Sequence, residues 1–355
     1  MSRSASRYWL GYLWPPALVF LLLFCSDVEI QGPSVPSVEI GLGDTIVVFP
    51  PPGGPILAGV RQLALSADQQ SVYVLDAGPA VHRIALDGTF LASFGRSGEG
   101  PGELTRPIAA QPTGDGGIWV LDRQRFTRYA PDGSVVRILP LTNRDAATFS
   151  PVGGDREVVV PAGQPMVPGQ ALLTRVGDSG IEDLENIPSD LPAPLADSRF
   201  GERFLGWKLA PLGAREIAIV LNGPVLRGWR VFVAVGLEAV DSVIELAMPT
   251  TAARVIARES ELAAMPDARP SPLSRVGTAA GRLWIVSTGL PNGPLAFTVP
   301  VRRGDPSLVV PAGQGLHDRE RRVRDVVVLS DRVFLAYEVE VVVRSAIRKQ
   351  DGVRN

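Results

Sequence analysis

Short apolar runs that end in turn-forming residues recur along most of the chain. Two segments are closely alike, VYVLDAGPAVHRIALDG from Val72 and IWVLDRQRFTRYAPDG from Ile118. Each holds an apolar residue, an aromatic residue and Val-Leu-Asp, and each ends in Asp-Gly, the strongest short signal for a β-hairpin. The offset between them is 46 residues before a one-residue gap and 45 after it. Each segment therefore predicts a strand, a turn, a strand, an Asp-Gly turn and a further strand.

Four later runs have the same pattern as the second strand of this unit: EVVVPAG (157–163), EIAIVLN (216–222), RLWIVST (282–288) and RVFLAYE (332–338). An aromatic residue lies near the centre of this strand in four of the six units, at Tyr73, Trp119, Trp284 and Phe334. Aromatic residues are common in strands, but recurrence at one strand position favours packing between neighbouring units. A repeat of about 45 residues with four strands is typical of one blade of a β-propeller.

The second strands are unevenly spaced. Their starts are separated by 46, 40, 59, 66 and 50 residues, at Val72, Ile118, Val158, Ile217, Leu283 and Val333. The two long steps require insertions. Residues 183–203 are rich in proline and polar residues and predict a loop. Residues 250–266 favour a helix that Thr251 caps and Pro266 ends, and we predict no other helix.

The glycine-rich stretch FGRSGEGPGEL runs from Phe94 to Leu104 between a predicted outer strand and the first strand of the next unit. Glycines with a basic residue suggest a phosphate-binding loop, but such a loop leads directly into a helix. We therefore interpret the stretch as a connector from the rim of one blade to the centre of the next. Arg96 and Glu99 should be exposed, and Gly100 or Gly102 should have a positive φ angle.

The segment VYVLDAG…HRIALDGTFLASFGRSGEGPGEL resembles the NHL repeat, and especially the six-bladed NHL-like propellers of exported bacterial proteins. The matching features lie within residues 60–140: Val74-Leu75-Asp76, Asp87-Gly88, Phe94-Gly95 and the Gly98 to Leu104 run. The resemblance implies a closed ring of six four-stranded blades that binds ligands on one face. We predict an all-β, six-bladed β-propeller (NHL- or TolB-like) over residues 37–355. Pairing of residues 38–49 with the last blade should close the ring and cover an open edge.

The amino end has the pattern of an export signal. Arg3 and Arg7 precede an uncharged run that ends at Cys25, and its apolar centre is short for a membrane span. Residues 1–25 are predicted to be a signal peptide, a lipoprotein signal or a membrane anchor. LLFC resembles a bacterial lipobox with lipid attachment at Cys25, but Phe24 departs from the small residue of that pattern. Residues 26–36 are predicted to be a linker.

Composition narrows the class of partner. The chain has 355 residues, is 45% hydrophobic and carries a net charge of −2. It is therefore expected to be globular, and it lacks the strong positive charge that broad nucleic-acid binding requires. Its basic residues are almost all arginines, since Lys208 and Lys349 are the only lysines.

Candidate chemistry is sparse. His82 is expected to be a surface or packing residue, and His317 lies in a charged connection. Propeller lyases of the NHL type use several histidines on zinc, and propeller lactonases use Glu, Asn and Asp on calcium. Asp76, Asp122 and Asn222 close corresponding second strands and are expected to make turns. We predict no catalytic residue, no metal ligand and no cofactor.

Two functions remain open at this point. The first is a non-catalytic cell-envelope binding protein or scaffold, exported and monomeric, whose propeller face binds a protein, peptide or glycan. It would bind no nucleic acid and would meet the membrane only through its amino-terminal segment. The alternative is a divalent-metal-dependent hydrolase or lyase on a six-bladed propeller.

Overall fold

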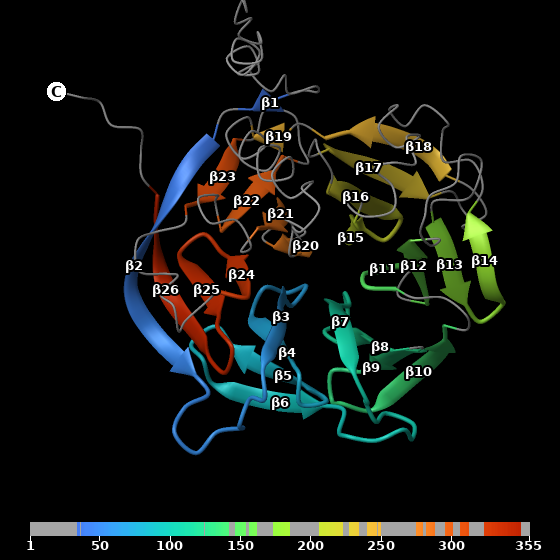
Figure 1. The fold of residues 1–355 in the computed structure, drawn as a ribbon, viewed down its shortest axis with the longest axis horizontal. Helices are drawn as coiled ribbons and strands as arrows, with labels where there is room; N and C mark the ends of the chain where they lie inside the picture. The colour runs from blue at the N-terminus through green and yellow to red at the C-terminus, as the bar shows by residue number, and fades with distance from the viewer. Residues whose placement is uncertain are drawn as a thin grey trace, which may run out of the picture.

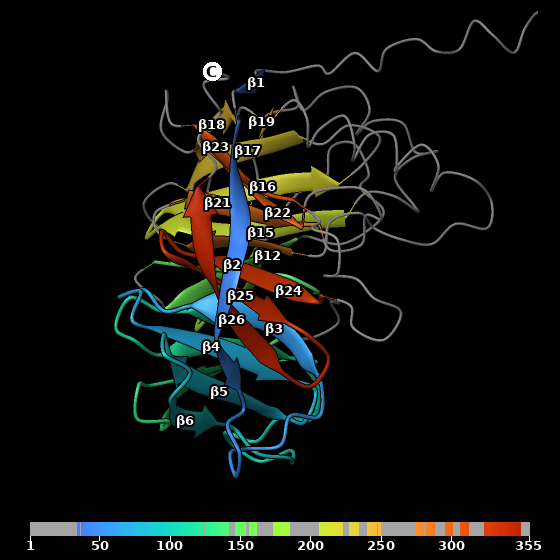
Figure 2. The ribbon, with the colours of Figure 1, turned by 90° about the vertical axis from the view of Figure 1, so that its left-hand side faces the viewer.

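The structure is a computed structural model. It describes residues 34–35, 37–123, 125–141, 146–153, 156–161, 173–184, 206–222, 227–233, 240–246, 248–249, 275–279, 282–287, 295–300, 306–311 and 323–348. Every regular element in these ranges is a β-strand, which confirms the all-β prediction. Figure 1 shows the sheets side by side in a ring, and Figure 2 shows the same ring from its edge. This arrangement is that of a β-propeller. Within the described part of the chain, no helix is long and apolar enough to cross a membrane.

Four antiparallel sheets have four strands each, in chain order across the sheet. The first contains β3 (Val60–Leu65), β4 (Ser71–Asp76), β5 (Ala80–Ala85) and β6 (Phe90–Phe94), and the second contains β7 (Pro107–Pro112), β8 (Ile118–Asp122), β9 (Arg125–Tyr129) and β10 (Val135–Pro140). The third contains β11 (Ser150–Val152), β12 (Glu157–Pro161), β13 (Leu173–Gly177) and β14 (Gly180–Leu184). The fourth contains β15 (Gly206–Gly213), β16 (Glu216–Asn222), β17 (Arg227–Val233) and β18 (Val240–Glu245).

A fifth sheet has eight strands in the order β20-β21-β22-β23-β2-β26-β25-β24. Its strands are β20 (Arg275–Ala279), β21 (Arg282–Val286), β22 (Ala296–Val299), β23 (Ser307–Val310), β2 (Ser37–Phe49), β26 (Val341–Arg348), β25 (Arg332–Ala336) and β24 (Asp325–Val328). A short parallel pair joins β1 (Ser34–Val35) to β19 (Met248–Pro249). The end of the expected linker over residues 26–36 is therefore a paired strand, because its backbone finds a partner in β19.

The predicted second strands are present in all the units. β4, β8, β12, β16, β21 and β25 contain them, and each pairs with a preceding strand that lies nearer the centre of the ring in Figure 1. Every residue of β4 and β8 is buried, as expected for strands covered on both faces. The aromatic residues of the second strands are buried as well, namely Tyr73, Trp119, Trp284 and Phe334.

The amino-terminal strand closes the ring, as the sequence predicts. β2 pairs antiparallel with β26 from Ile40↔Arg348 to Phe49↔Val341, and its first residues pair in parallel with β23. Figure 2 shows β2 running along the outside of the ring beside β26. Ile40 and Phe49 are buried in one apolar cluster with residues of β25 and β26. The outer edge of β26 is therefore covered by the opposite end of the chain.

The glycine-rich stretch is a connector between β6 and β7. Its ends, Phe94 and Leu104, are buried in one cluster with residues of both sheets, and the Phe94 ring lies 6.2 Å from that of Tyr129 in β9. Gly102 has a φ of +74°, where a Cβ would lie 2.5 Å from Val135, as the prediction for this pair of glycines allows. Arg96 is exposed and pairs with Glu103. No helix follows, so the connector interpretation is confirmed.

The predicted insertions at residues 183–203 and 250–266 lie outside the described residues, apart from the end of β14.

Candidate binding site at the channel mouth

Asp76 and Asp122 hold the chain at corresponding places in the first two sheets. Each is buried at the end of a second strand and accepts two backbone amides from the segment that enters the first strand of its sheet. Asp76 accepts from Ala58 at 3.1 Å and Gly59 at 2.7 Å, and Asp122 accepts from Thr105 at 2.9 Å and Arg106 at 2.5 Å. Both carboxylates thus hold the chain entry 16 to 18 residues earlier, a longer-range role than the local turn that the sequence interpretation expects.

His82 is a packing residue of the first sheet and not a surface residue. Its Nδ1 lies 2.7 Å from Oγ of Ser93, and its Nε2 lies 3.8 Å from Oδ2 of Asp76. Burial by itself raises the pKa of Asp76, but His82 and the amides of Ala58 and Gly59 outweigh it, so this pKa lies below its usual range.

Polar side chains link neighbouring inner strands around the centre of the ring. The Gln62 carboxamide in β3 donates to the Ala110 carbonyl at 2.7 Å and accepts the Ala110 amide at 2.9 Å in β7. Thr148, just before β11, bonds both backbone groups of Leu209 in β15 at 3.2–3.3 Å. These backbone groups are buried and need partners because no strand pairs with them at the centre. At the centre of the ring, these side chains therefore make the hydrogen bonds that a paired strand would make within a sheet.

Where the ring closes, an ion pair also links neighbouring inner strands. Asp325 in β24 accepts the Leu63 amide of β3 at 2.6 Å and lies 2.8 Å from Nε of Arg275 in β20. Burial raises the pKa of the Asp325 carboxyl, while Arg275 and two backbone amides oppose this rise. Asp325 thus connects three inner strands that lie far apart in the sequence.

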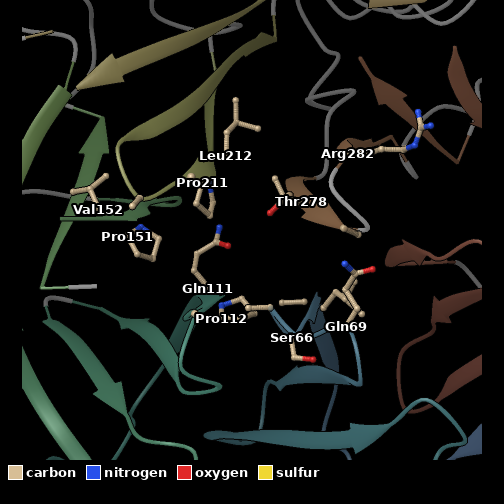
Figure 3. A pocket seen from close by; sticks show the side chains of 18 of the residues that line it. Ser66, Gln69, Gln111, Pro112, Pro151, Val152, Pro211, Leu212, Thr278 and Arg282 are labelled. Carbon is tan, nitrogen blue, oxygen red and sulfur yellow. The ribbon is translucent and has the colours of Figure 1, made fainter. Parts of the chain in front are cut away.

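One end of the inner strands opens into a cavity of about 400 Å³. Turns of five units contribute to it, and Figure 3 shows their side chains arranged around the opening. Ser66, Gln69, Gln111, Thr278 and Arg282 supply hydroxyl, amide and guanidinium groups. The remaining wall is mostly aliphatic, with Ala64, Leu65, Pro112, Pro151, Val152, Pro211, Leu212 and Ala279.

Three prolines occupy one equivalent position in this wall. They are Pro112, Pro151 and Pro211, and they pair across the sheet with Ile118, Val158 and Ile217, respectively. These three partners are the first residues of three predicted second strands. Leu65 and Thr278 occupy the same position in the first and fifth sheets, opposite Val72 and Leu283. The repeat therefore produces a ring of rigid or apolar residues at this mouth, interrupted by a threonine hydroxyl. Such a wall suits a ligand with both apolar and hydrogen-bonding groups.

The structure brings together few of the residues singled out from the sequence. Asp76 and His82 are neighbours, whereas Asp122 lies in another sheet; the Asn222 side chain, His317 and Cys25 are outside the described residues. Within the described residues, no three His, Cys, Asp or Glu side chains gather as a metal site would require. The channel residues were missed, although each sheet carries a polar residue on or next to a mainly apolar first strand.

The ring of antiparallel sheets defines the class: the protein is an all-β, propeller-like protein. No family model and no curated protein matches the chain in sequence. Among solved structures, the chain is similar to a "putative exported protein" of Bacteroides fragilis, with 8% identity, a TM-score of 0.50 and coverage of 88% of this chain and 100% of that one. A gluconolactonase of Xanthomonas campestris aligns with 12% identity and a TM-score of 0.44, over 90% of this chain and 99% of that one. The WD40 domain of Neurospora crassa Pan2 aligns with 11% identity and a TM-score of 0.43, over 88% of this chain and 95% of that one.

Proposed function

We propose that the protein is a non-catalytic binding protein or scaffold of the cell envelope, and that the 400 Å³ cavity holds a segment of a protein, a peptide or a glycan. The cavity itself carries the proposal. It is built by turns of five units and combines an aliphatic wall with hydroxyl and amide groups and the guanidinium groups of Arg275 and Arg282. Backbone amides and sugar hydroxyls need such partners, while proline and leucine surfaces cover the apolar faces of these ligands.

We further propose that the ring is a six-bladed NHL- or TolB-like propeller. The eight-stranded sheet divides into two blades, β20–β23 and β24–β26 with β2 as the outer strand. Each of these blades then has four strands, like the other four sheets. Two features support this interpretation. The first is the set of NHL-like motifs within residues 60–140, and the second is the connector between β6 and β7, in which Gly102 has a positive φ angle.

If the ligand binds in this cavity, substitutions of the lining residues Gln69 and Thr278 should weaken its affinity, whereas substitution of Gln70 should not. The purified protein should be screened against glycan and peptide arrays, and each ligand found should be titrated against Gln69→Ala and Thr278→Arg. We expect affinity at least about tenfold weaker, because the first change removes an amide and the second fills the mouth. Gln70→Ala is the matched control, since Gln70 adjoins Gln69 but does not line the cavity. Ligands whose affinity is unchanged in both variants would place binding elsewhere.

We propose that residues 1–25 direct export and that the propeller works outside the cytoplasm, either tethered or free. The two-arginine start and the short apolar run support this. The similarity to a protein named as exported agrees with it.

The form of attachment is tested by cell fractionation with metabolic lipid labelling of wild type and Cys25→Ser. A label lost in the variant identifies a lipoprotein, whose two or more acyl chains would anchor it stably. An unlabelled protein with an intact amino terminus in the membrane identifies a signal anchor. Full-length protein in the cytosol would contradict export.

A further inference from the structure

A second cavity lies at the opposite end of the same inner strands. Its volume is about 120 Å³. The 400 Å³ cavity is lined mostly by residues near the ends of these strands, and this one mostly by residues near their starts, while Gln111 and Arg275 line both. Liquid water occupies about 30 Å³ per molecule, so the space suits an ion or group of a few non-hydrogen atoms.

The cavity is lined by an excess of positive charge. The ionisable residues among its lining are four cations, Arg61, Lys208, Arg275 and Arg324, and one carboxylate, Asp325. Asp325 already pairs with Arg275, and Arg324 lies 3.7 Å from Glu338 outside the cavity. Strand β7 and the segment just before β11 contribute only uncharged residues, including Gln111 and Thr148. The field in the cavity is therefore positive.

Among the residues that the structure describes, none is a counter-charge to Lys208. Its ammonium forms no hydrogen bond or ion pair with the described residues, and burial lowers its pKa. Taking an ammonium out of water is costly unless an anion or other acceptor compensates it. Lysine is also a rare choice in this chain, which carries its positive charge elsewhere on arginine, apart from Lys349. A lysine provides three donors on a compact charge, which suits one oxyanion in a small space.

We propose that this cavity binds a small oxyanion, a carboxylate or a phosphate group, with Lys208 as its direct donor. Arg61 and Arg275 of the inner strands hold the cavity at positive potential, and the anion supplies the counter-charge that no described residue gives Lys208. Lys208 does not line the ligand cavity at the other mouth, and the proposal does not depend on the function proposed for that cavity.

Because the chain has two lysines, one measurement can resolve the site. Reductive methylation with ¹³C-formaldehyde labels Lys208, Lys349 and the amino terminus, and Lys349→Met assigns the lysine signals. In the wild-type protein we expect the Lys208 signal to titrate below the usual lysine pKa of about 10.4. Saturating inorganic phosphate or succinate should raise that pKa by about one unit or more, since each prefers the protonated amine. The two probes distinguish phosphate from carboxylate recognition.

Calorimetry on the unmethylated protein gives an independent readout. Lys208→Met, which keeps the length of the stem, should weaken binding of the better probe at least about tenfold, while Lys208→Arg should retain part of it. Arg96→Ala is the control, because Arg96 is an exposed cation on the β6–β7 connector. The proposal is overturned if neither probe shifts the Lys208 signal, or if Lys208→Met binds both probes like wild type. Loss of oxyanion binding in Thr278→Arg, at the other mouth, would also contradict a separate site.

Discussion

Removal of residues 37–49 should open the ring and make the protein aggregate. This segment is β2, which pairs with β26 over most of its length and buries Ile40 and Phe49. Loss of a buried phenylalanine side chain alone costs about 3–5 kcal/mol, and whole domains are stable by only about 5–15 kcal/mol. The deletion also exposes the edge of β26, a template for pairing with another chain. We expect a large loss of thermal stability in calorimetry and large particles in light scattering.

A synthetic peptide of residues 37–49 provides the control. If the missing strand causes the defect, the peptide should restore part of the stability in trans, because the vacated edge pairs with an added strand. A peptide in which Ile40 and Phe49 are replaced by serine should not. A deletion variant that remains monomeric with unchanged thermal stability would show that β2 does not close the ring.

Trp119→Ala should destabilise the protein by about 3–5 kcal/mol. Trp119 is fully buried in β8. It packs in one cluster that joins the second and third sheets and includes Leu121, Phe126, Phe149, Val158 and Val160. Removing the indole therefore leaves a cavity between two sheets that strand pairing holds rigid. Equilibrium urea unfolding of wild type and variant measures the difference.

Trp119→Phe separates packing from hydrogen bonding. The indole nitrogen of Trp119 is buried and has no hydrogen-bond partner among the described residues, so phenylalanine loses volume but none of the described bonds. The aromatic position of β25 already holds Phe334, also fully buried. We expect Trp119→Phe to cost less than half as much as Trp119→Ala. Equal costs for the two variants, or a loss below about 1 kcal/mol for alanine, would contradict packing between the sheets.

The similarity of the first two units made the fold predictable. Val-Leu-Asp and Asp-Gly recur at a nearly constant offset, and hairpin turns and strand patterns are encoded locally. The same local logic identified the connector, since Phe94 and Leu104 had to be covered while Arg96 did not. Local sequence patterns were less informative for His82. The alternation of apolar and polar residues placed His82 in a strand but did not show whether its side chain is buried.

The inner-strand network could not be found by these means. Gln62 and Ala110 are 48 positions apart, and Asp325 and Leu63 are 262 apart. A single polar residue in an apolar strand has no signature that reveals its partner, because any exposed turn or edge would tolerate it equally well. Lys208 illustrates the point: its rarity was visible in the sequence, but its place in a cavity was not.

By itself, the sequence determined the strands, their grouping into units, the rim-to-centre connector and the pairing of the amino-terminal strand with the last unit. These features follow from hydrophobic alternation, turn residues and the need to cover an edge, all of which act over a few residues or one repeat. Only the tertiary structure decided which residues face the channel and how its two mouths differ. Closing the ring brings together the first strands of distant units, so Arg275 meets Asp325 and Lys208 faces a cavity whose described lining has an excess of positive charge. That juxtaposition depends on the curvature of the whole ring, which no single repeat contains.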